Sequence, residues 1–542
     1  MRKTSSRTSS LYVSSLLLAI FFLSSCTPNQ SLPTDGGQPG TGSRGSFDAV
    51  RYVSIGNSIT AGFLSNSLYE AGQRNSYPYL IARQAHGVDS ARTIFQMPIF
   101  SDPGTPGRIE LGGFTTTGTP ITVINPSAGQ PTNLTLPRPY NNLGVPGMLL
   151  AEAPTATSSA SSLSRSAALD FVLRNPTLGN RTTIQQALAL TPTFITFHLG
   201  NNDVLGYATS GGVSPAAPVP TALFRAALDS SLSQLRRGAP NAKIVALNVP
   251  DVSVIPFVTT AGPLVRTAFA VGQSLGRIPA AVPGVFYHRR GSLVPGLPIA
   301  RDSAAIMRTA DMGDLSRPTG CAILLTGAAV GTGLGSTANP ARSVWLGLFN
   351  AYRAANPTLT WEVFRTTFFA PALDTLQPFG LSPANPVPNQ WVLDESEIAT
   401  ARAAVGAYNE AIQSQVTAGR AVAVIDINGL FGRILRNELV VDGELLKADL
   451  GTGSVISLDG VHPSPKAHGV IANEILRIIN REFNATIPLV IVRDLPNGLV
   501  QAGQSATVSS AATDLEVLAA NRSLFEQVAK SLGAFSDQRD QK

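Results

Sequence analysis

The stretch Ala49–Gly62 reads Ala-Val-Arg-Tyr-Val-Ser-Ile-Gly-Asn-Ser-Ile-Thr-Ala-Gly, and it decides the fold expected for this 542-residue chain. Its apolar run from Ala49 to Ile55 stops at Gly56, which is typical of a buried parallel strand running into a loop. Flanking glycines permit a tight turn from strand to helix, which would expose the Ser58 hydroxyl and its backbone N–H. A serine at an ordinary helix N-terminus fits the same letters, so this stretch alone leaves both interpretations open.

Further along the chain, apolar runs alternate with amphipathic stretches. Four more strands are expected, at Tyr140–Val145, Thr193–Leu199, Lys243–Val249 and Ala421–Ile427. Helices are expected at Ser76–His86, Ser162–Arg174, Thr183–Leu190, Thr221–Arg237, Asp394–Ala418 and Pro465–Phe483. This alternation predicts an α/β fold with a central parallel sheet and helices on both of its faces. In such sheets the ligand lies at the carboxyl ends of the strands.

The main domain is expected over residues 47–490, with two large insertions. Residues 90–138 are rich in Gly, Pro and Thr with short β-like pieces such as Pro120–Ile124, which indicates turns or hairpins. Residues 258–392 predict a mixed structure, a cap or substrate-binding subdomain. Within it, Gly327–Gly335 lacks the Lys of a phosphate loop and is interpreted as a loop. Residues 491–542 form a tail with a helix expected from Asp514 to Leu532, to which no role is assigned.

Three further segments place polar residues next to expected strand or helix ends. They are Asn142-Leu-Gly-Val-Pro-Gly147, Gly200-Asn-Asn-Asp203 and Asp459-Gly-Val-His462. His462 suits a base at neutral pH, and a carboxylate at Asp459 could hold the histidine tautomer. The Asn202 amide and the Gly147 N–H could stabilise an oxyanion. Each segment alone also fits an ordinary turn, but with Ser58 they supply a nucleophile, its base, an orienting group and oxyanion donors.

The four segments, in this order, resemble the blocks of the SGNH (GDSL-type) hydrolase family. The resemblance matches Ser58 to the nucleophile, Gly147 and Asn202 to the oxyanion-hole residues, and Asp459 and His462 to the Asp-x-x-His block. It covers about residues 48–68, 140–207, 240–257 and 394–488. It implies a three-layer α/β/α flavodoxin-like fold and a serine esterase or lipase without a metal or organic cofactor.

Three matters stay open: the effect of Asn57, the ester substrate and the oligomeric state. Asn57 stands where the family has Asp, and because Asn supplies similar local hydrogen bonds, we expect a modest effect on loop geometry. The motifs do not distinguish an acyl lipid from an acylated glycan as the ester substrate. Oligomeric state is likewise not indicated by the sequence.

Two alternatives compete with this interpretation. Gly272-Gln-Ser-Leu-Gly276 matches the Gly-x-Ser-x-Gly elbow of another hydrolase class, with Ser274 as nucleophile. That elbow needs a strand before it and a helix after it, and Pro279 would interrupt such a helix. A surface lipoprotein that binds a glycan or lipid on a catalytically idle fold of the same kind is the alternative from a different class.

The first residues indicate where the protein is located. Arg2, Lys3 and Arg7 precede an apolar run from Leu11 to Leu23, which is too short for the roughly 20 residues of a spanning helix. Residues 1–26 are therefore expected to be a secretory signal peptide, and Leu23-Ser-Ser-Cys26 resembles a bacterial lipobox. The resemblance implies lipid on Cys26 and anchoring in the cell envelope, with the outer membrane favoured. Residues 27–46 are expected to be a flexible linker.

Composition restricts the partners. Loss of residues 1–26, with three basic and no acidic residues, lowers the formal charge from +6 to +3. No basic stripe interleaved with aromatics is present, so a nucleic-acid partner is not expected. Charged residues make up 14%, against about 25% in ordinary domains. If Cys26 carries lipid, Cys321 has no disulfide partner and is expected to be a buried small residue.

Overall fold

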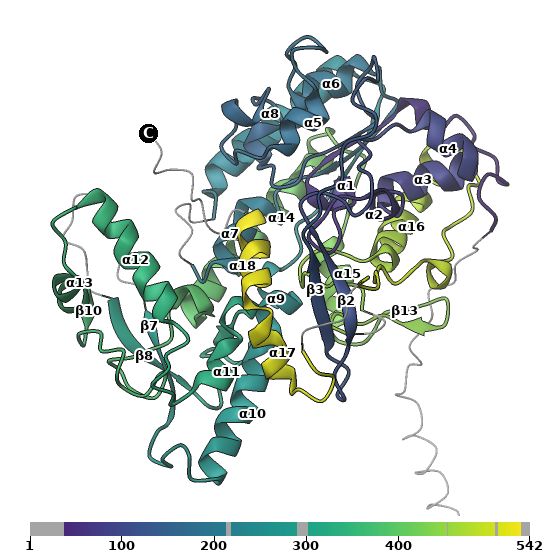
Figure 1. Cartoon of the computed structure of the whole chain (residues 1–542). Helices are drawn as coiled ribbons and strands as arrows, with labels where there is room; N and C mark the ends of the chain where they lie inside the picture. Colours follow the sequence, from purple (N-terminus) through teal and green to yellow (C-terminus); the bar gives the residue numbers. More distant parts are fainter. Residues whose placement is uncertain (1–36, 213–217, 290–301, 452–453, 504–507, 533–542) are drawn as a thin grey trace, which may run out of the picture.

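The computed structural model describes residues 37–212, 218–289, 302–451, 454–503 and 508–532 (Figure 1). Its central sheet contains β1 (Tyr52–Gly56), β4 (Asn142–Gly144), β5 (Phe194–His198), β6 (Lys243–Leu247) and β12 (Ala423–Ile425). The strands lie in the order β4-β1-β5-β6-β12, and every pairing is parallel. The predicted α/β fold with a central parallel sheet is confirmed.

Successive side chains of each strand point to opposite faces of the sheet, and both faces are covered by an apolar core. Val53 and Ile55 of β1 join one apolar core, whereas Tyr52 joins the core on the opposite face. The first core includes residues of α6 (Thr183–Ala189), α8 (Thr221–Gly238) and α14 (Glu395–Thr417). The second includes residues of α3 (Tyr77–His86) and α16 (Pro465–Glu482), and Figure 1 shows these two helices beside each other.

Short elements connect the sheet to its flanking helices. They are η1 (Ala49–Arg51), α1 (Ser58–Ala61), α2 (Glu70–Gln73), α4 (Val88–Ile94), α7 (Asn202–Thr209), η4 (Val252–Val254), α9 (Pro256–Thr259) and α15 (Ile427–Leu435). The 90–138 insertion contains the antiparallel hairpin of β2 (Arg108–Phe114) and β3 (Pro120–Asn125), as predicted. A second small hairpin joins β13 (Val440–Val441) to β14 (Glu444–Leu445).

The helix expected at Ser162–Arg174 is much shorter than predicted, since α5 spans only Ala168–Leu173. The preceding residues make other contacts. Ser164 donates from its N–H and its hydroxyl to the Glu152 carboxylate, and Arg165 has φ +54°, which interrupts a right-handed helix. The side chain of Glu152, which is close in space and not in sequence, therefore fixes where the helix begins.

The large insertion forms a separate lobe at the lower left of Figure 1. Its three-stranded sheet, ordered β10-β8-β7, contains β7 (Gly284–Arg289), β8 (Asp302–Arg308) and β10 (Phe369–Ala370). The lobe also contains α10 (Ala261–Ser274), β9 (Ala322–Ile323), η5 (Leu325–Gly327), α11 (Ala329–Gly333), α12 (Arg342–Ala355), α13 (Trp361–Thr367) and β11 (Val392–Leu393). The prediction of a mixed α and β structure holds.

The glycine-rich stretch Gly327–Gly335 is not the loop that was expected, because it contains the end of η5 and all of α11. Its glycines permit close packing. A Cβ at Gly331 would lie 2.6 Å from Leu515, and one at Gly333 would lie 2.6 Å from Pro340. Glycine is present here because neighbouring side chains contact the helix backbone.

The C-terminal tail docks on the insertion. The single helix expected at Asp514–Leu532 is instead two helices, α17 (Asp514–Ala520) and α18 (Arg522–Ser531). The break falls at Asn521, a residue that forms helix interiors poorly. The tail also runs beside the β2–β3 hairpin, where the Leu111 N–H donates to Val500 O at 2.7 Å.

Of the segment expected to be a flexible linker, residues 27–46, the structure describes only residues 37–46. Residues 37–46 pack beside the end of α16. Gly40 N donates to Gln84 O at 2.9 Å, Ser46 N donates to Phe483 O at 3.1 Å, and Thr486 N donates to Ser43 O at 2.7 Å. These backbone bonds hold the segment against the domain although it contains few apolar side chains.

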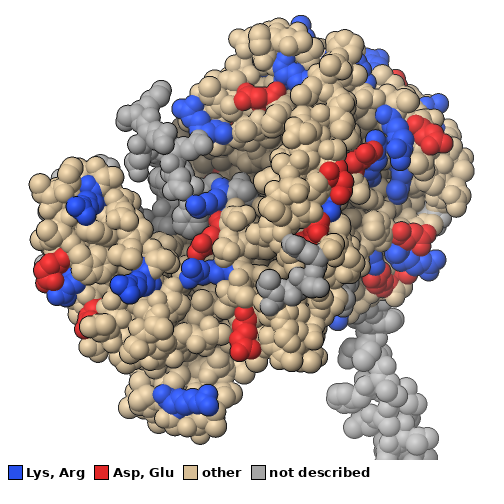
Figure 2. Space-filling view, viewed as in Figure 1, with Lys and Arg blue, Asp and Glu red and all other residues tan. Residues whose placement is uncertain are grey.

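The surface agrees with the low charge of the chain. Figure 2 shows Lys, Arg, Asp and Glu scattered singly or in small groups over one face, with uncharged residues between them. Within the described ranges, no helix combines the length and the apolarity that crossing a membrane requires.

Candidate active site

Ser58 lies where the sequence places it, at the turn from β1 into α1. Asn57 is the N-cap of α1, and its side chain accepts a hydrogen bond from the Ile59 N–H at 3.1 Å. Ser58 is therefore the first helical residue, whose N–H has no partner inside the helix. A Cβ on Gly56 would lie 1.9 Å from Thr60 Oγ1, so glycine is required for this close approach of strand and helix.

His462 and Asp459 lie in a tight hairpin just before α16. Ser457 N donates to His462 O at 2.8 Å, and Gly460 closes the turn with φ +75°. The His462 Nε2 atom lies 3.0 Å from Ser58 Oγ, and the Nδ1 atom lies 2.9 Å from Asp459 Oδ2. Ser58, His462 and Asp459 thus form one hydrogen-bonded chain, although Ser58 and His462 are 404 positions apart in the sequence.

Asp459 is fully buried and held as a carboxylate. Its Oδ1 accepts from the Ser457 hydroxyl and from the N–H groups of Val461 and His462, each at 2.9 Å. Its Oδ2 accepts from Asn66 N at 3.0 Å in addition to the His462 ring. Burial alone would raise the pKa of Asp459, but His462 and these hydrogen bonds lower it to about 2. A permanently ionised carboxylate fixes the histidine so that Nδ1 carries the proton and Nε2 accepts from the serine.

Ser65 and Asn66 are contributors that the sequence did not indicate. Asn66 N donates to Asp459, and Ser65 N donates to the Ser457 hydroxyl at 3.1 Å. Both residues have positive φ, 51° and 62°. Asn tolerates this conformation better than most residues, and this was the single available signal for a special turn. The Phe63 ring packs on the His462 ring at 4.8 Å between centroids.

Gly147 and Asn202 follow the two strands that flank β1. Val145-Pro146-Gly147 forms a turn with Gly147 at φ +79°, and Met148 N closes the turn on Val145 O at 3.1 Å. Asn202 begins α7 after β5, and its Nδ2 donates to Met148 O at 3.0 Å. The Asn202 amide is thus linked to the Gly147 turn through one of its two N–H groups.

A buried acid holds the same turn from the other side. Asp203 Oδ2 accepts from Leu150 N at 3.1 Å, while Glu152 Oε2 accepts from Leu149 N at 2.9 Å. Burial raises the pKa of Asp203 to about 7, the Leu150 N–H opposes the rise, and Glu152 adds to it. The sequence motif drew attention to Asn202 and gave no indication that its neighbour fixes the opposing loop.

The remaining candidates lie apart from this chain of hydrogen bonds. His198 is buried in β5, and His468 is buried in α16, where it accepts from Tyr77 N at 3.3 Å. Burial lowers their pKa values to about 4 and about 3, so both rings are neutral at pH 7. Ser274 ends α10 and donates to Val271 O, so the strand that the elbow motif requires before it is replaced by a helix.

Cys321 is buried, as predicted, and free of any disulfide. Burial and the nearby Glu395 raise the pKa of its thiol to about 12, which keeps it protonated and unreactive. Over the described ranges, no group of three His, Cys, Asp or Glu residues is arranged to hold a metal ion.

Comparison with known proteins gives no relative. No family model, no curated protein and no solved structure matches this chain.

Proposed function

We propose that the protein is a serine hydrolase that cleaves carboxylic esters. The observation that carries the proposal is the chain Ser58 Oγ–His462–Asp459, with hydrogen bonds of 3.0 and 2.9 Å at its two links. Nucleophile, base and orienting carboxylate in hydrogen-bond contact are the arrangement that serine acyl transfer needs.

In the proposed reaction, His462 Nε2 takes the Ser58 proton as Oγ attacks the ester carbonyl carbon. The negative charge develops on the carbonyl oxygen, near the N–H groups of Ser58 and Gly147 and the Asn202 amide. The imidazolium, stabilised by Asp459, then donates its proton to the leaving alcohol. Water attacks the acyl-enzyme with His462 again as base, and the acid leaves. Every proton transfer uses side chains already present.

The fold supports assignment to the SGNH hydrolase family. Numbered along the chain, the five parallel strands lie in the order 2-1-3-4-5, which is the flavodoxin-like order. Ser58 follows the first of these strands, and the candidate oxyanion residues follow its two neighbours. We infer a three-layer α/β/α member of that family, with the β2–β3 hairpin and the 258–392 lobe as its own additions.

The test is hydrolysis of p-nitrophenyl acetate, butyrate, octanoate and palmitate by residues 37–542, with Ser58→Ala as control. We expect activity that disappears in Ser58→Ala while the circular dichroism spectrum stays unchanged. A folded wild-type protein inactive on all four esters would favour the idle, ligand-binding alternative. The 3.0 Å contact between Ser58 and His462 argues against that alternative, because ligand binding alone does not require a base in hydrogen-bond contact with the serine.

We also propose that the protein is exported and anchored in the bacterial cell envelope through lipid on Cys26. The lipobox-like Leu23–Cys26 supports this, and it lies outside the described residues. Full-length protein is expected in the membrane fraction, and Cys26→Ser is expected in the soluble fraction. Equal partitioning of the two would remove the anchor.

A further inference from the structure

An apolar layer lies directly behind the turn that carries Asp459 and His462. The Phe257 N–H of α9 donates to Gly460 O at 2.9 Å. A Cβ on Gly460 would lie 3.1 Å from Phe257 N and 3.2 Å from Leu325 Cδ1 in η5. Helix α9, just before the insertion, and η5, within it, therefore both touch the turn between the candidate base and its carboxylate.

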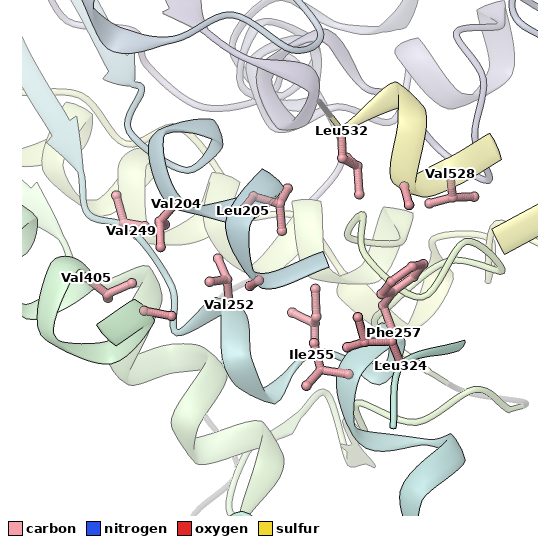
Figure 3. Packing of buried hydrophobic residues seen from close by; sticks show 14 of the residues in the cluster. Val204, Leu205, Val249, Val252, Ile255, Phe257, Leu324, Val405, Val528 and Leu532 are labelled. Carbon is pink, nitrogen blue, oxygen red and sulfur yellow. The ribbon is translucent and has the colours of Figure 1, made fainter. Parts of the chain in front are cut away.

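Helix α18 covers this layer with an apolar face. Its buried residues recur at helical spacing, which places them on one side: Leu524, Phe525, Val528, Ala529 and, just beyond the helix, Leu532. The Phe525 ring meets the Phe257 ring edge-on at 6.4 Å, and α18 also packs against η5. Figure 3 shows Val528 and Leu532 on one side of this cluster, with Phe257 and Leu324 on the other.

The same layer extends toward the candidate oxyanion residue. Leu205 lies one helical turn after Asn202 in α7, and it belongs to the same core cluster as Val252, Ile255 and Leu532. In Figure 3 Leu532 points toward Leu205. Leu205, Ile255, Phe257, Leu324 and Leu325 belong to one core cluster, and we call the apolar surface that they form the trough. It extends from α7, which begins at Asn202, to η5, which meets the His462 turn at Gly460.

Little of the candidate site is exposed to solvent, and α18 covers the trough. Ser58 is 5% exposed, His462 is 2% exposed and Asn202 is 9% exposed. An acyl chain that used the trough would have to displace α18, which packs on Phe257 and η5. Helix α18 follows all strands of the central sheet in the chain, so it can leave without disturbing them. Helix α17 remains held to the β2–β3 hairpin, because Asp514 accepts from the hydroxyls of Thr115 and Thr117 at 2.7 and 2.5 Å.

We propose that this trough binds the apolar acyl chain of the ester substrate, and that α18 occupies it as a lid when no substrate is bound. The proposal rests on the esterase function above and names its substrate class as long-chain acyl esters. An apolar chain and the apolar face of α18 compete for the same side chains. A short ester reaches Ser58 without using the trough.

The first experiment weakens the lid with Phe525→Asp and uses Gln527→Asp as the matched control. Both add one negative charge to α18, but Phe525 is buried and Gln527 is exposed. We expect Phe525→Asp to raise kcat/KM for p-nitrophenyl palmitate about tenfold, since apparent affinity follows the open fraction. Hydrolysis of the acetate ester should stay within twofold, and Gln527→Asp should change neither rate.

A binding measurement separates this inference from the esterase proposal. In a Ser58→Ala background, fluorescence titration with cis-parinaric acid reports chain binding without catalysis. Tighter binding with Phe525→Asp than with Gln527→Asp supports the trough even if the wild type hydrolyses no ester. Ser58-dependent acetate hydrolysis with no change in parinaric acid binding or palmitate rate overturns the lid and leaves the esterase standing.

A second variant covers the case in which Phe525→Asp does not fold. Leu532→Ser lies just beyond the end of α18, where a polar residue loosens the lid with less disturbance. The same selective gain on palmitate is expected. If either folded variant lowers the melting temperature and reduces both ester rates in proportion, α18 is a structural brace and the proposal fails.

Discussion

Asp459 is the residue whose surroundings best explain the candidate site, because five hydrogen bonds hold its carboxylate in one position. Asp459→Asn keeps the shape but gives His462 an amide donor, which favours the wrong histidine tautomer. We expect kcat to fall about 10⁴-fold, as in serine triads generally. The exposed Asp494→Asn serves as control and should retain wild-type rates on p-nitrophenyl butyrate. A loss below tenfold in Asp459→Asn would exclude the carboxylate from the mechanism.

Asn202 carries the second prediction at this scale. Asn202→Ala removes the amide proposed as an oxyanion donor and also its bond to Met148 O, which ties Asn202 to the Gly147 turn. We expect kcat to drop about 10²–10³-fold with little change in KM, because an oxyanion donor acts mainly in the transition state. The measurement is steady-state kinetics, with thermal melting to confirm the fold. An unchanged kcat would remove Asn202 from the site.

The raised pKa of Asp203 predicts that the free energy of unfolding depends on pH. Its pKa of about 7 in the folded protein exceeds the value of about 3.9 in an unfolded chain. The folded state therefore holds this proton more tightly, and stability is lost as the pH rises from about 4 through 7. Asp203→Asn cannot ionise and retains an acceptor for Leu150 N–H. The melting temperature of Asp203→Asn minus that of the wild type should be larger at pH 8 than at pH 5. A difference that does not change with pH would contradict the raised pKa of Asp203.

The sequence indicated the site residues but not their supports. Ser58, Asp459 and His462 stood out because each lies in a short motif with a chemical purpose. The donors Ser65 and Asn66 lie in a turn with positive φ. Asn66 N donates to Asp459 across 393 residues, and Ser65 N donates to the Ser457 hydroxyl, which in turn donates to Asp459. A backbone N–H carries no side-chain signature, so no pattern in the letters could identify these contacts.

At the scale of elements, glycine decides how closely β4 and α1 approach. A Cβ on Gly144 would lie 2.4 Å from Ala61 N, so Gly144→Ala must push the strand away from the helix that carries Ser58. We expect a loss of about 1–3 kcal/mol in unfolding free energy, typical of overpacking, together with reduced ester hydrolysis.

The matched control for Gly144→Ala is Gly347→Ala in α12, where nothing lies within 4 Å of the added Cβ. Alanine in an exposed helix should stabilise by about 0.5–1 kcal/mol there. Urea unfolding of both variants measures the contrast. Equal and small effects would mean that β4 and α1 adjust without strain.

Predictability also differed between elements. The long helix α14 lay where expected, because Asp394 and Glu397 form a capping box that the letters show directly. Helix α5 was overestimated, because Glu152 draws Ser164 into hydrogen bonds that no local pattern reveals. Local signals therefore located elements that begin with their own caps, and failed where a distant side chain sets the boundary.

For the whole molecule, the sequence predicted the parallel sheet because its strands are short apolar runs ending at glycine or polar motifs. It gave no account of how the 258–392 lobe and the tail meet. That meeting depends on packing such as α17 against α11 and α18 against η5, between segments far apart in the chain. Periodicity shows that a helix has an apolar face and does not show which partner covers it.

The N-terminal segment provides the prediction at the largest scale, since residues 37–46 join the start of the domain to the chain after α16. Three backbone hydrogen bonds to Gln84, Phe483 and Thr486 hold it there. With roughly 0.5–1.5 kcal/mol net for each bond, a protein starting at residue 47 should melt several degrees below one starting at residue 37. Ester hydrolysis at 25 °C should be unchanged, because the segment does not touch Ser58 or His462.

A point variant tests the same docking without shortening the chain. A Cβ on Gly42 would lie 1.9 Å from Thr486 O, so Gly42→Ala in the longer protein must displace the segment. It should reproduce most of the loss in melting temperature, whereas Gly503→Ala, with open space around its Cβ, should not. If the truncated protein and Gly42→Ala both melt with the wild type, residues 37–46 act as the flexible tether that their composition suggests. A loss in both would instead place the start of the folded domain at residue 37, which shortens any membrane tether from Cys26 to the ten residues 27–36.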